Sequence, residues 1–467
     1  MIEPITDPSV LEGYLTDASN VRGHAEALLR PRSVEEVAEA LAWCQARAIP
    51  LTITAGRTST TAAPVPFGGW LLSTERLNRV LEIGEETATA EGGVFLGAFQ
   101  AECEARGRLF PPDPTSRHEC TLGAAIAGNA SGARSFRYGP IRPWVQALQV
   151  VTPTGEVLEL ERGQPLPGDW LVPSWAEPRV KTAAGYAPPA EAIDVFIGQE
   201  GTLGLITRAT VRLTALPAGV LGLLAYFPDR ARAVDFVERA RAAARRDPGG
   251  ALSPRCLEYL DVHCLDLARE RVGGVPEGAR AALFCEQEIE ATHGEEGHLE
   301  AWWEALLDCG ALADDTLATT DAAGQAQLHA LRHAIPAGVN EEVIRNQMPK
   351  VGTDLAVPDS ALREMMDAYE AVTLPHVLFG HIGDNHLHLN LLPRTAAELE
   401  QARATYRALS RRAVALGGTV SAEHGIGKLK KDHLADMLAP DTLAAFRRLK
   451  EAFDPAWILG RGTLFDP

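Results

Sequence analysis

The chain has 467 residues, of which 46% are hydrophobic and 23% are charged, and its formal net charge is -18 at pH 7. This length predicts two or three domains, and the negative charge argues against nucleic acid as a partner because phosphates would be repelled. No apolar run approaches the roughly 20 residues needed to span a bilayer.

Two further features of the composition bear on location. The N-terminus lacks the basic and apolar regions of a secretory signal. The seven cysteines are scattered and never form a C-x-x-C pair, which fits a reducing compartment and argues against an iron–sulfur cluster held by this chain. We expect a cytoplasmic, multidomain protein; peripheral association with the inner face of the membrane stays open.

The first 215 residues alternate helical and strand patterns. Ser33 and Glu36 form a capping box that begins a helix, and Pro50 closes that segment. A strand and a second helix are expected within residues 86–107, with Gly107 at the helix end. Further strands, including a hairpin that turns at Thr154-Gly155, are expected in residues 51–55, 68–74, 79–83 and 147–160.

The same region contains two stretches typical of ligand binding. Residues 111–140 contain too much Gly, Ala and Pro for ordinary packing, which indicates close approach of the backbone to a ligand. The turn TAGRTSTTAAPVP (Thr54 to Pro66) follows a strand, and its small and hydroxyl residues offer donors to a pyrophosphate. The sequence has no G-x-G-x-x-G, so we do not expect a Rossmann fold.

After residue 215 the pattern changes to an α+β domain in which helices cover a sheet. A strand is followed by a helix and a Gly-rich stop within residues 223–250, and two further strands are expected in residues 254–261 and 280–288. The last stretch, residues 438–465, predicts a helix that stops at Asp454-Pro455.

The segment GHIGDNHLHLN (Gly380 to Asn390) gathers three histidines. In an extended strand His386, His388 and Asn390 share one face, while the intervening leucines face the core. A Gly-rich turn brings His381 back over the same place. Two imidazoles at i and i+2 with a third from an adjacent loop are a common way to hold a transition metal.

These segments together resemble the flavin-dependent 2-hydroxy-acid dehydrogenases of the vanillyl-alcohol-oxidase type. That family includes D-lactate dehydrogenases, glycolate oxidase subunits and D-2-hydroxyglutarate dehydrogenases. The resemblance is carried, in the family's order, by YLTDAS (Tyr14 to Ser19), RPRSVEEVAEAL, AGRTS, PPDP (Pro111 to Pro114), TLGAAIAGNASGARSFRYG (Thr121 to Gly139), KTAAGY (Lys181 to Tyr186), GQEGTLGLIT (Gly198 to Thr207), LEYLD (Leu257 to Asp261), GHIGDNHLHLN and TVSAEHGIGKLK (Thr419 to Lys430).

The resemblance implies an α+β fold in three parts. Residues 1–215 form a two-subdomain FAD-binding domain, residues 216–415 form a substrate or cap domain with an antiparallel sheet and the metal site, and residues 416–467 return to the FAD-binding domain to complete the active site. Because no His occupies the pyrophosphate turn, we expect FAD to be bound without a covalent bond.

The implied FAD contacts come from four segments of the first part. The family's pyrophosphate turn is usually rich in glycine, whereas Thr, Ser and Ala fill positions 58–63 here. The expected contacts are Gly56, Arg57, Thr58, Ser59, Thr60, Thr61, Pro112, Asp113, Pro114, Thr115, Gly123, Gly128, Asn129, Ser131, Gly132, Tyr138, Glu200, Gly201 and Ile206.

The resemblance also implies a divalent metal held by His381, His388 and Glu423. Zinc is the first choice for this ligand set, with manganese and ferrous iron as alternatives. His386 departs from the family, which usually has Asn there, and it is either a neighbour of the ligands or a fourth ligand.

The reaction implied is oxidation of a D-2-hydroxy acid, in which the C2 hydride passes to flavin N5. His424 resembles the family's base for the hydroxyl proton. Arg332 and Lys350 are the positions that clamp the substrate carboxylate, and Asn390 is expected to hydrogen-bond the substrate or a ligand. The resemblance also implies that relatives specific for dicarboxylates have a hydroxyl residue four positions after the clamp Arg, to hold the second carboxylate. Here that position is Pro336, which has no donor, and this favours D-lactate or glycolate over D-2-hydroxyglutarate.

Several partners and alternatives stay open. The electrons of reduced FAD would pass to a quinone, a cytochrome, a partner protein or oxygen, and a homodimer is one of the open oligomeric states. Two other classes of protein are a flavin-free metallohydrolase and an FAD-binding subunit that has lost turnover.

Overall fold

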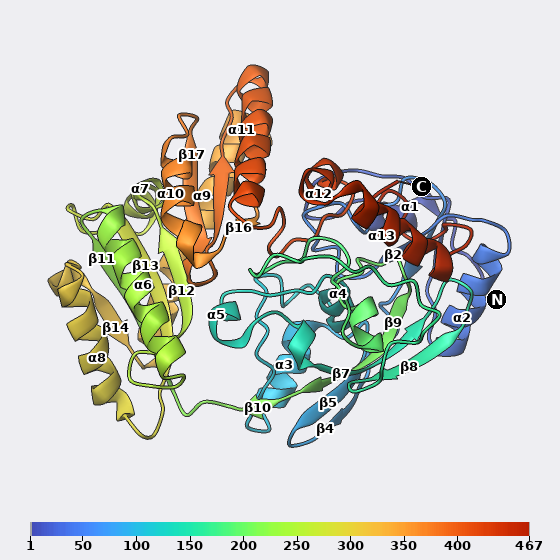
Figure 1. Cartoon of the computed structure of the whole chain (residues 1–467), viewed down its shortest axis with the longest axis horizontal. Helices are drawn as coiled ribbons and strands as arrows, with labels where there is room; N and C mark the ends of the chain where they lie inside the picture. The colour runs from blue at the N-terminus through green and yellow to red at the C-terminus, as the bar shows by residue number, and fades with distance from the viewer. Residues whose placement is uncertain (1, 467) are drawn as a thin grey trace.

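The computed structural model describes residues 2–466 of the chain, which form two lobes (Figure 1). One lobe contains the first part of the chain together with its C-terminal end. The other contains the segment between them, which begins at β11. The active-site residues expected from the sequence come from both lobes.

A small parallel sheet begins the first lobe. The side chain of Ser33 accepts a hydrogen bond from the amide of Glu36 and so caps the helix α2 (Val34–Gln45). The carboxylate of Glu36 accepts from the amide of Arg32 and not from that of Ser33, so the reciprocal half of the predicted capping box does not form. In the sheet the middle strand pairs in parallel with both neighbours, and the order is β1 (Ala27–Leu29), β3 (Trp70–Ser73) and β2 (Leu51–Thr54).

A five-stranded antiparallel sheet forms the rest of this lobe. The predicted hairpin joins its last two strands, and Gly155 in the turn has a φ of 86°, which suits glycine. The strand order is β4 (Val80–Ile83), β5 (Thr87–Glu91), β9 (Leu205–Arg212), β7 (Val145–Val151) and β8 (Val157–Glu161). The helices α3 (Leu96–Glu104) and α4 (Leu122–Ala127) share its core.

An eight-stranded sheet builds the second lobe. Its order is β14 (Leu317–Thr319), β11 (Val220–Phe227), β13 (Ala281–Glu288), β12 (Pro254–Leu260), β17 (His376–His381), β18 (His386–Leu391) and β15 (Val351–Gly352), with β16 (Leu355–Ala356) also paired to β18. All its pairings are antiparallel, as predicted for the cap domain.

Helices cover both faces of this sheet, and each face has its own core. One core includes residues of α6 (Arg230–Arg246), α8 (Gly294–Asp308), α10 (Leu362–Glu370) and α11 (Ala396–Ala415). The other includes residues of α7 (Val262–Arg271) and α9 (Ala322–Asn346).

The histidine segment forms the predicted strand β18. Leu387, Leu389 and Leu391 are buried in the core that includes α6, so His386 and His388 project from the opposite face. The strand β17 pairs with β18 through a tight turn and places His381 opposite His386. Alternation along one strand and a short turn therefore bring the three imidazoles together, as the sequence predicts.

The C-terminal segment returns to the first lobe. Its helices α12 (Lys431–Met437) and α13 (Pro440–Phe453) lie on that lobe in Figure 1, and Phe446, Leu449 and Phe465 join its core. The loop between α11 and α12 crosses from one lobe to the other and carries Glu423 and His424.

The remaining elements are short. They are α1 (Pro8–Leu11), η1 (Glu12–Tyr14), β6 (Arg108–Leu109), α5 (Ser135–Tyr138), η2 (Arg142–Trp144), η3 (Ala192–Phe196), β10 (Thr214–Ala215), η4 (Ala313–Asp315), η5 (Asp359–Ala361) and η6 (Ile382–Asp384).

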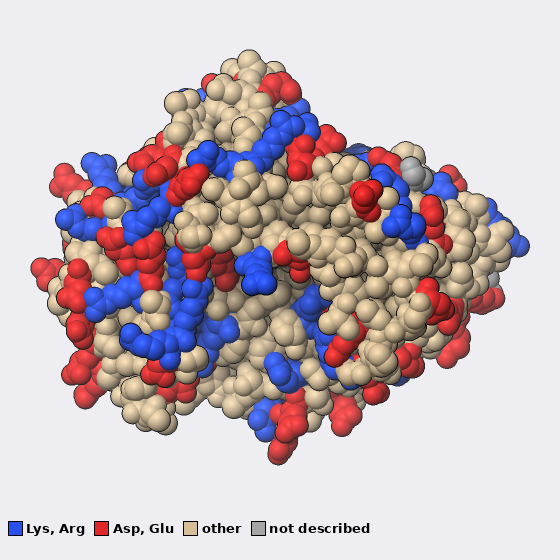
Figure 2. All heavy atoms as spheres, in the orientation of Figure 1, with Lys and Arg blue, Asp and Glu red and all other residues tan. Residues whose placement is uncertain are grey.

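Three further features concern the helices, the cysteines and the surface charge. No helix within residues 2–466 is long and apolar enough to cross a membrane, and the seven cysteines of the described chain are free thiols. Figure 2 shows Lys and Arg side chains gathered over α6. Several arginines of α6 pair with acids, as Arg239 does with Asp308.

Candidate active site

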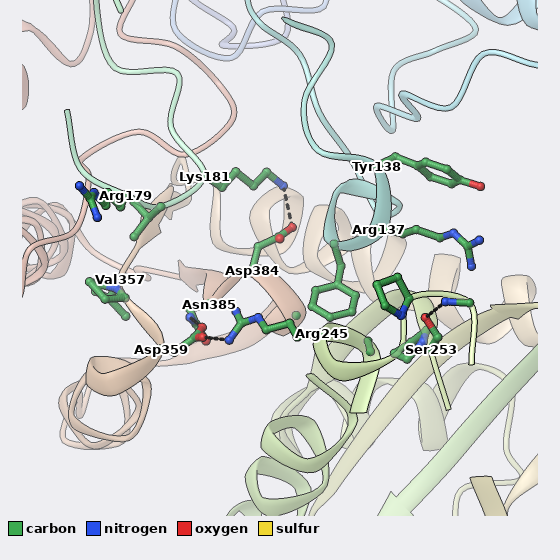
Figure 3. Close-up of a pocket in the computed structure, with 18 residues that line it drawn as sticks. Arg137, Tyr138, Arg179, Lys181, Arg245, Ser253, Val357, Asp359, Asp384 and Asn385 are labelled. Carbon is green, nitrogen blue, oxygen red and sulfur yellow. Dashed lines mark hydrogen bonds and ion pairs between the residues drawn. The ribbon is translucent and has the colours of Figure 1, made fainter. Parts of the chain in front are cut away.

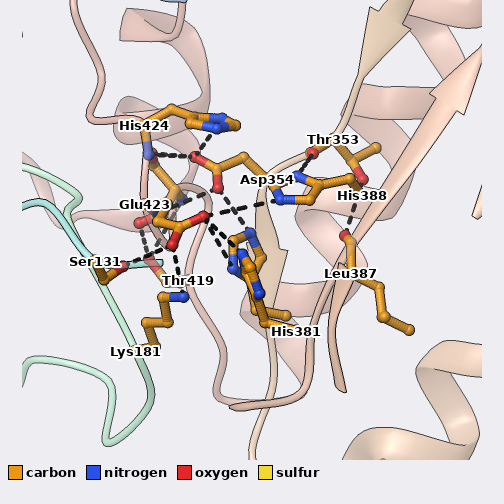
Figure 4. A network of polar contacts seen from close by, with 12 residues as sticks. Ser131, Lys181, Thr353, Asp354, His381, Leu387, His388, Thr419, Glu423 and His424 are labelled. Carbon is orange, nitrogen blue, oxygen red and sulfur yellow. Dashed lines mark hydrogen bonds and ion pairs between the residues drawn. The ribbon is translucent and has the colours of Figure 1, made fainter. Parts of the chain in front are cut away.

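Four side chains meet between the histidine strands and the C-terminal segment (Figure 4). His381, His386, His388 and Glu423 each offer one ligand atom, and these atoms lie within 4.8 Å of one another. The Oε2 atom of Glu423 is 3.3 Å from His381 Nε2, 3.8 Å from His386 Nδ1 and 3.9 Å from His388 Nε2. Three ring nitrogens therefore face one carboxylate oxygen.

The other nitrogen of each ring contacts an acceptor of the surrounding protein. Such contacts fix the ring orientation and leave the inner nitrogen free to bind a metal. The three contacts are His381 Nδ1 to Glu258 Oε1 at 3.1 Å, His386 Nε2 to Asp354 Oδ1 at 2.9 Å, and His388 Nδ1 to the carbonyl oxygen of Thr353 at 3.0 Å.

Glu423 is held through its second oxygen. Oε1 accepts hydrogen bonds from Ser131 Oγ and Lys181 Nζ, each at 2.9 Å. The ammonium of Lys181 also donates to Ser135 Oγ at 2.9 Å and lies 3.8 Å from Asp384. Because the first lobe holds Oε1, Oε2 remains directed at the imidazoles.

Asp354 organises the loop that carries Glu423. Its Oδ2 accepts from Ser421 Oγ and Lys430 Nζ, each at 2.7 Å, and from the amide of His424 at 3.0 Å. Its Oδ1 accepts from the amide of Glu423 at 3.2 Å. Burial opposes its ionisation, but His424 and Lys430 lower the pKa of Asp354 well below its ordinary value. Asp354 is therefore a buried carboxylate.

His424 lies beside the donor group without belonging to it. Its ring stacks on His388, with centroids 5.2 Å apart and planes at 20°. Its Nδ1 is 3.6 Å from Asp354, and its side chain is 37% exposed. Desolvation by the neighbouring groups lowers the pKa of His424 below its ordinary value, so a neutral imidazole is available as a base.

The expected carboxylate clamp is divided between two places. Arg332 donates from Nε and Nη2 to Glu258, with Nη2 at 2.7 Å from Oε1, so this carboxylate bridges Arg332 and His381. Its Nη1 donates to no protein acceptor within residues 2–466. The exposed Lys350 donates from Nζ to Asn390 Oδ1 at 3.0 Å. Asn390 lies on β18, and Lys350 stands directly before β15, the strand that pairs with β18.

The donor group is chemically suited to a divalent metal. It offers imidazole nitrogens and one carboxylate, which are the ligands preferred by zinc, manganese and iron. Within the described chain, neither nitrogen of the fully buried His386 forms a hydrogen bond of ordinary geometry. Buried polar atoms are usually paired, so this nitrogen set fits a bound ion.

The turn after β2 suits a pyrophosphate. Within residues 2–466, the amides of residues 56–60 donate to no protein acceptor, which leaves them free to bind an anion. Arg57 and Ala62, near the two ends of the turn, have φ values of 56° and 59°. Outside glycine such values are uncommon and concentrate at functional sites.

The other expected FAD segments pack closely around this turn. A Cβ on Gly56 would lie 2.0 Å from the carbonyl oxygen of Glu119, and one on Gly132 would lie 1.8 Å from that of Asp113, so both positions require glycine. The loop 112–115 and the segment 123–132 are thus in backbone contact. Ile206 is buried in β9, next to Gly92.

Glu200 and Tyr138 contact other parts of the protein. The carboxylate of Glu200 accepts from the amides of Ile426 at 2.8 Å and Gly427 at 2.7 Å, which fastens the C-terminal loop to the first lobe. The hydroxyl of Tyr138 donates to Glu288 on β13. The structure thus gives both residues roles at the junction of the lobes.

A cleft of about 890 Å³ opens between the lobes next to Lys181 (Figure 3). Arg137, Arg179 and Lys181 line it from the first lobe, and Arg245 and Asp359 line it from the second. Asp384, which contacts Lys181, also lines this cleft. The cleft therefore adjoins Lys181, the residue that donates to the carboxylate of the donor group.

Comparison with known proteins identifies the protein family. Residues 25–161 match the family model of the FAD binding domain, and residues 220–464 match that of the FAD linked oxidases, C-terminal domain. These matches define an FAD-binding protein. The chain belongs to the FAD-linked oxidase family. Family membership, the fold class and FAD as cofactor are thereby confirmed as predicted.

Named relatives cover nearly the whole chain. D-2-hydroxyglutarate dehydrogenase of Xanthomonas citri pv. viticola is 31% identical over 99% of this chain and 94% of its own length. Glycolate oxidase subunit GlcD of Bacillus subtilis is 29% identical over 94% of this chain and 89% of its own length. D-lactate dehydrogenase of Anaerostipes hadrus is 28% identical over 97% of this chain and 92% of its own length. Alkyldihydroxyacetonephosphate synthase shares the fold, with a TM-score of 0.68 at 18% identity over 98% of this chain and 81% of its own.

Three residues of the site were not singled out from the sequence. They are Lys181, Glu258 and Asp354, which contact Glu423, His381 and His386 respectively. The first two stand in segments that carry the family resemblance, KTAAGY and LEYLD, and the third in PKVGTD next to Lys350. The sequence offered one signal for these three residues: each is a charged residue inside a segment that is already linked to the site.

Proposed function

We propose that this protein is an FAD-dependent dehydrogenase that oxidises a D-2-hydroxy acid, D-lactate or glycolate first, to the 2-oxo acid. The observation that carries the proposal is the buried group of three imidazoles and Glu423 beside the imidazole of His424, whose ring stacks on His388. It lies where the C-terminal segment meets the FAD-binding lobe. The names of the relatives support the reaction class.

In this proposal His381, His388 and Glu423 hold a divalent metal, with zinc as the expectation from the ligand types. A bound metal would polarise the substrate hydroxyl, and bound FAD would supply the hydride acceptor. His424 takes the hydroxyl proton at Nε2, because Asp354 lies near Nδ1 and favours the tautomer that is protonated there.

The substrate carboxylate is bound by Lys350 and by the unused Nη1 of Arg332. Asn390 orients the ammonium of Lys350, and Glu258 orients the guanidinium of Arg332. Pro336 lies one helical turn beyond Arg332 in α9 and has no N–H to donate. This supports a monocarboxylate as substrate.

A second candidate substrate is D-2-hydroxyglutarate. It is favoured by the relative from Xanthomonas citri pv. viticola, which carries that name and is 31% identical to this chain. The flavin-free metallohydrolase is not retained, because residues 25–161 match an FAD binding domain.

The proposal extends to organisation and partners. We retain the division into an FAD-binding domain (1–215), a cap domain (216–415) and a returning segment (416–467), and we propose noncovalent FAD. The cysteines of the described chain are dispersed free thiols, so the electrons would leave reduced FAD for a quinone, a cytochrome or a partner protein.

The test is a visible spectrum of the purified protein, recorded without oxygen before and after each substrate is added. We expect a flavin band that bleaches with D-lactate or glycolate and persists with L-lactate. Bleaching by D-2-hydroxyglutarate alone would identify this second candidate as the substrate. A bound flavin that no 2-hydroxy acid reduces, after metal is supplied, would contradict the proposed activity and favour an FAD-binding subunit without turnover.

A further inference from the structure

His386 departs from the Asn that is usual in the resembling family, and it belongs to the donor group formed by His381, His388 and Glu423. We propose that His386 is a fourth protein ligand of the metal and binds it through Nδ1. The metal site is then built from three imidazoles and one carboxylate. This inference rests on the proposed function and adds a ligand to its metal site.

The main support is an arrangement that all three rings share. Each has one nitrogen on an outer acceptor and the other directed at Oε2 of Glu423. For His386 the outer contact is Asp354 at 2.9 Å and the inner distance is 3.8 Å, between the 3.3 Å of His381 and the 3.9 Å of His388. A carboxylate behind a ring nitrogen is the usual support of a metal-binding histidine. His386 is thus placed like the two expected ligands.

Burial separates this role from a purely structural one. His386 is 0% exposed, and its Nδ1 has no hydrogen-bond partner within the described chain. A histidine that served only to orient Asp354 would need Nε2 alone. Its second nitrogen would then be left unpaired in a buried, polar place, which is unfavourable. A metal ion at the centre of the group satisfies Nδ1.

A fourth ligand changes which ion is expected. Four protein ligands complete a tetrahedral zinc site, which is the arrangement of structural zinc. An ion that also meets a substrate must accept more than four ligands, which manganese(II) and ferrous iron do readily. The site therefore fits manganese or ferrous iron better than the zinc expected for three ligands.

The experiment counts the imidazoles bound to the ion. The full chain is labelled with nitrogen-15 histidine, freed of metal with a chelator and loaded with Mn²⁺ alone. Pulsed electron paramagnetic resonance then reports the histidine nitrogens coupled directly to Mn²⁺. We expect three in the wild-type protein and two in His386→Asn.

Two control variants identify the third imidazole. His433 stacks on Tyr406, outside the donor group, so His433→Asn should keep three coupled nitrogens. His424→Asn should also keep three, because His424 does not belong to the donor group of His381, His386, His388 and Glu423; it forms the other candidate group with Asp354 and His388. A loss of one nitrogen in His424→Asn, with none lost in His386→Asn, would overturn the assignment in favour of His424.

The remaining outcomes separate this inference from the proposed function. Two coupled nitrogens in the wild-type protein would overturn the fourth ligand and leave the proposed function standing. Absence of binding of Mn²⁺, Zn²⁺ and Fe²⁺ alike, in a protein whose flavin is still reduced by D-lactate, would overturn the metal site as a whole. If His386→Asn does not fold, the wild-type and His424→Asn counts decide: three in both supports His386.

Discussion

Lys181 donates a hydrogen bond at 2.9 Å to Glu423, a residue 242 positions further along the chain. The lysine belongs to the FAD-binding lobe, whereas Glu423 stands on the loop that returns from the cap. The side chain of Lys181 is only 5% exposed, so this ion pair is shielded from solvent. The junction of the lobes thus fixes the carboxylate of the proposed metal site.

The first prediction concerns this contact. Lys181→Met should weaken metal binding by about 10- to 100-fold, the usual effect of removing a group that orients a metal ligand. Flavin content should stay unchanged, because Lys181 is not among the expected FAD contacts. The measurement is a metal titration of the chelator-treated protein, with the flavin absorbance recorded in parallel.

A matched control is Lys431→Met, because Lys431 pairs with Asp466 on the surface of the C-terminal segment. It should leave the metal titration as in the wild-type protein. Equal metal affinity for Lys181→Met and wild-type protein would show that Glu423 needs no such support.

Local patterns in the sequence predicted the elements that present the site. The alternation of His and Leu over residues 386–391 became β18, with Leu387 and Leu389 in the core. Ser33 caps α2 as expected. These features depend on residues a few positions apart, whose spacing is visible in a single sequence.

The acidic residues that orient the histidine rings, in contrast, come from positions far away in the sequence. Glu258 reaches His381 from β12 and Asp354 reaches His386 from the loop after β15. Nothing in the local spacing of these acids distinguishes them from surface carboxylates. Only the order of the strands in the sheet brings them behind the rings, so the sequence indicated the ligands but not what orients them.

The second prediction tests the ligands themselves. His388→Ala and Glu423→Ala should each weaken metal binding and abolish turnover while keeping FAD and its yellow colour. Metal analysis by mass spectrometry and the visible spectrum provide the two readouts. His376→Ala is the control, because His376 belongs to a separate group with Asp261 and His263. Metal lost only in the control would place the ion at that second group.

The third prediction concerns the base. His424→Ala should keep metal and FAD but slow flavin reduction by D-lactate roughly 10²-fold or more, the usual range for a general base. The backbone amide that bonds Asp354 remains in the variant, so the loop should keep its position. Stopped-flow absorbance measures the rate, and a wild-type rate would remove His424 from the mechanism.

The fourth prediction concerns Arg332 and Glu258. Burial opposes ionisation of Glu258, but Arg332 and His381 hold the pKa of that carboxyl well below its ordinary value. Arg332→Met leaves a buried carboxylate without its cation and should lower the free energy of unfolding by about 3 kcal/mol. Denaturant unfolding measures this loss in the single variant and in the double variant with Glu258→Gln.

In the double variant the buried charge is absent, so its free energy of unfolding should exceed that of Arg332→Met. Arg230→Met is a suitable control, since its pairs with Asp367 and Glu370 have carboxylates that are 69% exposed. Such pairs contribute about 0–1 kcal/mol. Equal losses at the two arginines would mean that Glu258 does not depend on Arg332.

The fifth prediction is a pH dependence of stability that originates at Glu200. Burial raises the pKa of Glu200 to about 7 from its ordinary 4.5, although the amides of Ile426 and Gly427 oppose the shift. Between these two pH values the folded protein keeps a proton that the unfolded chain releases. The contribution of Glu200 to the free energy of unfolding therefore falls as pH rises through this window, by at most about 1.4 kcal/mol per pH unit.

The glutamine in Glu200→Gln cannot ionise. As pH rises from about 4.5 to 7, the free energy of unfolding of the variant should therefore increase relative to that of the wild-type protein. Other groups titrate equally in both proteins and cancel in this difference. Urea unfolding of the FAD-bound proteins at several pH values measures it, with a substitution at the exposed Glu102, Glu102→Gln, as the control. A difference independent of pH would mean that Glu200 is ionised throughout, held as an anion by the amides of the returning loop.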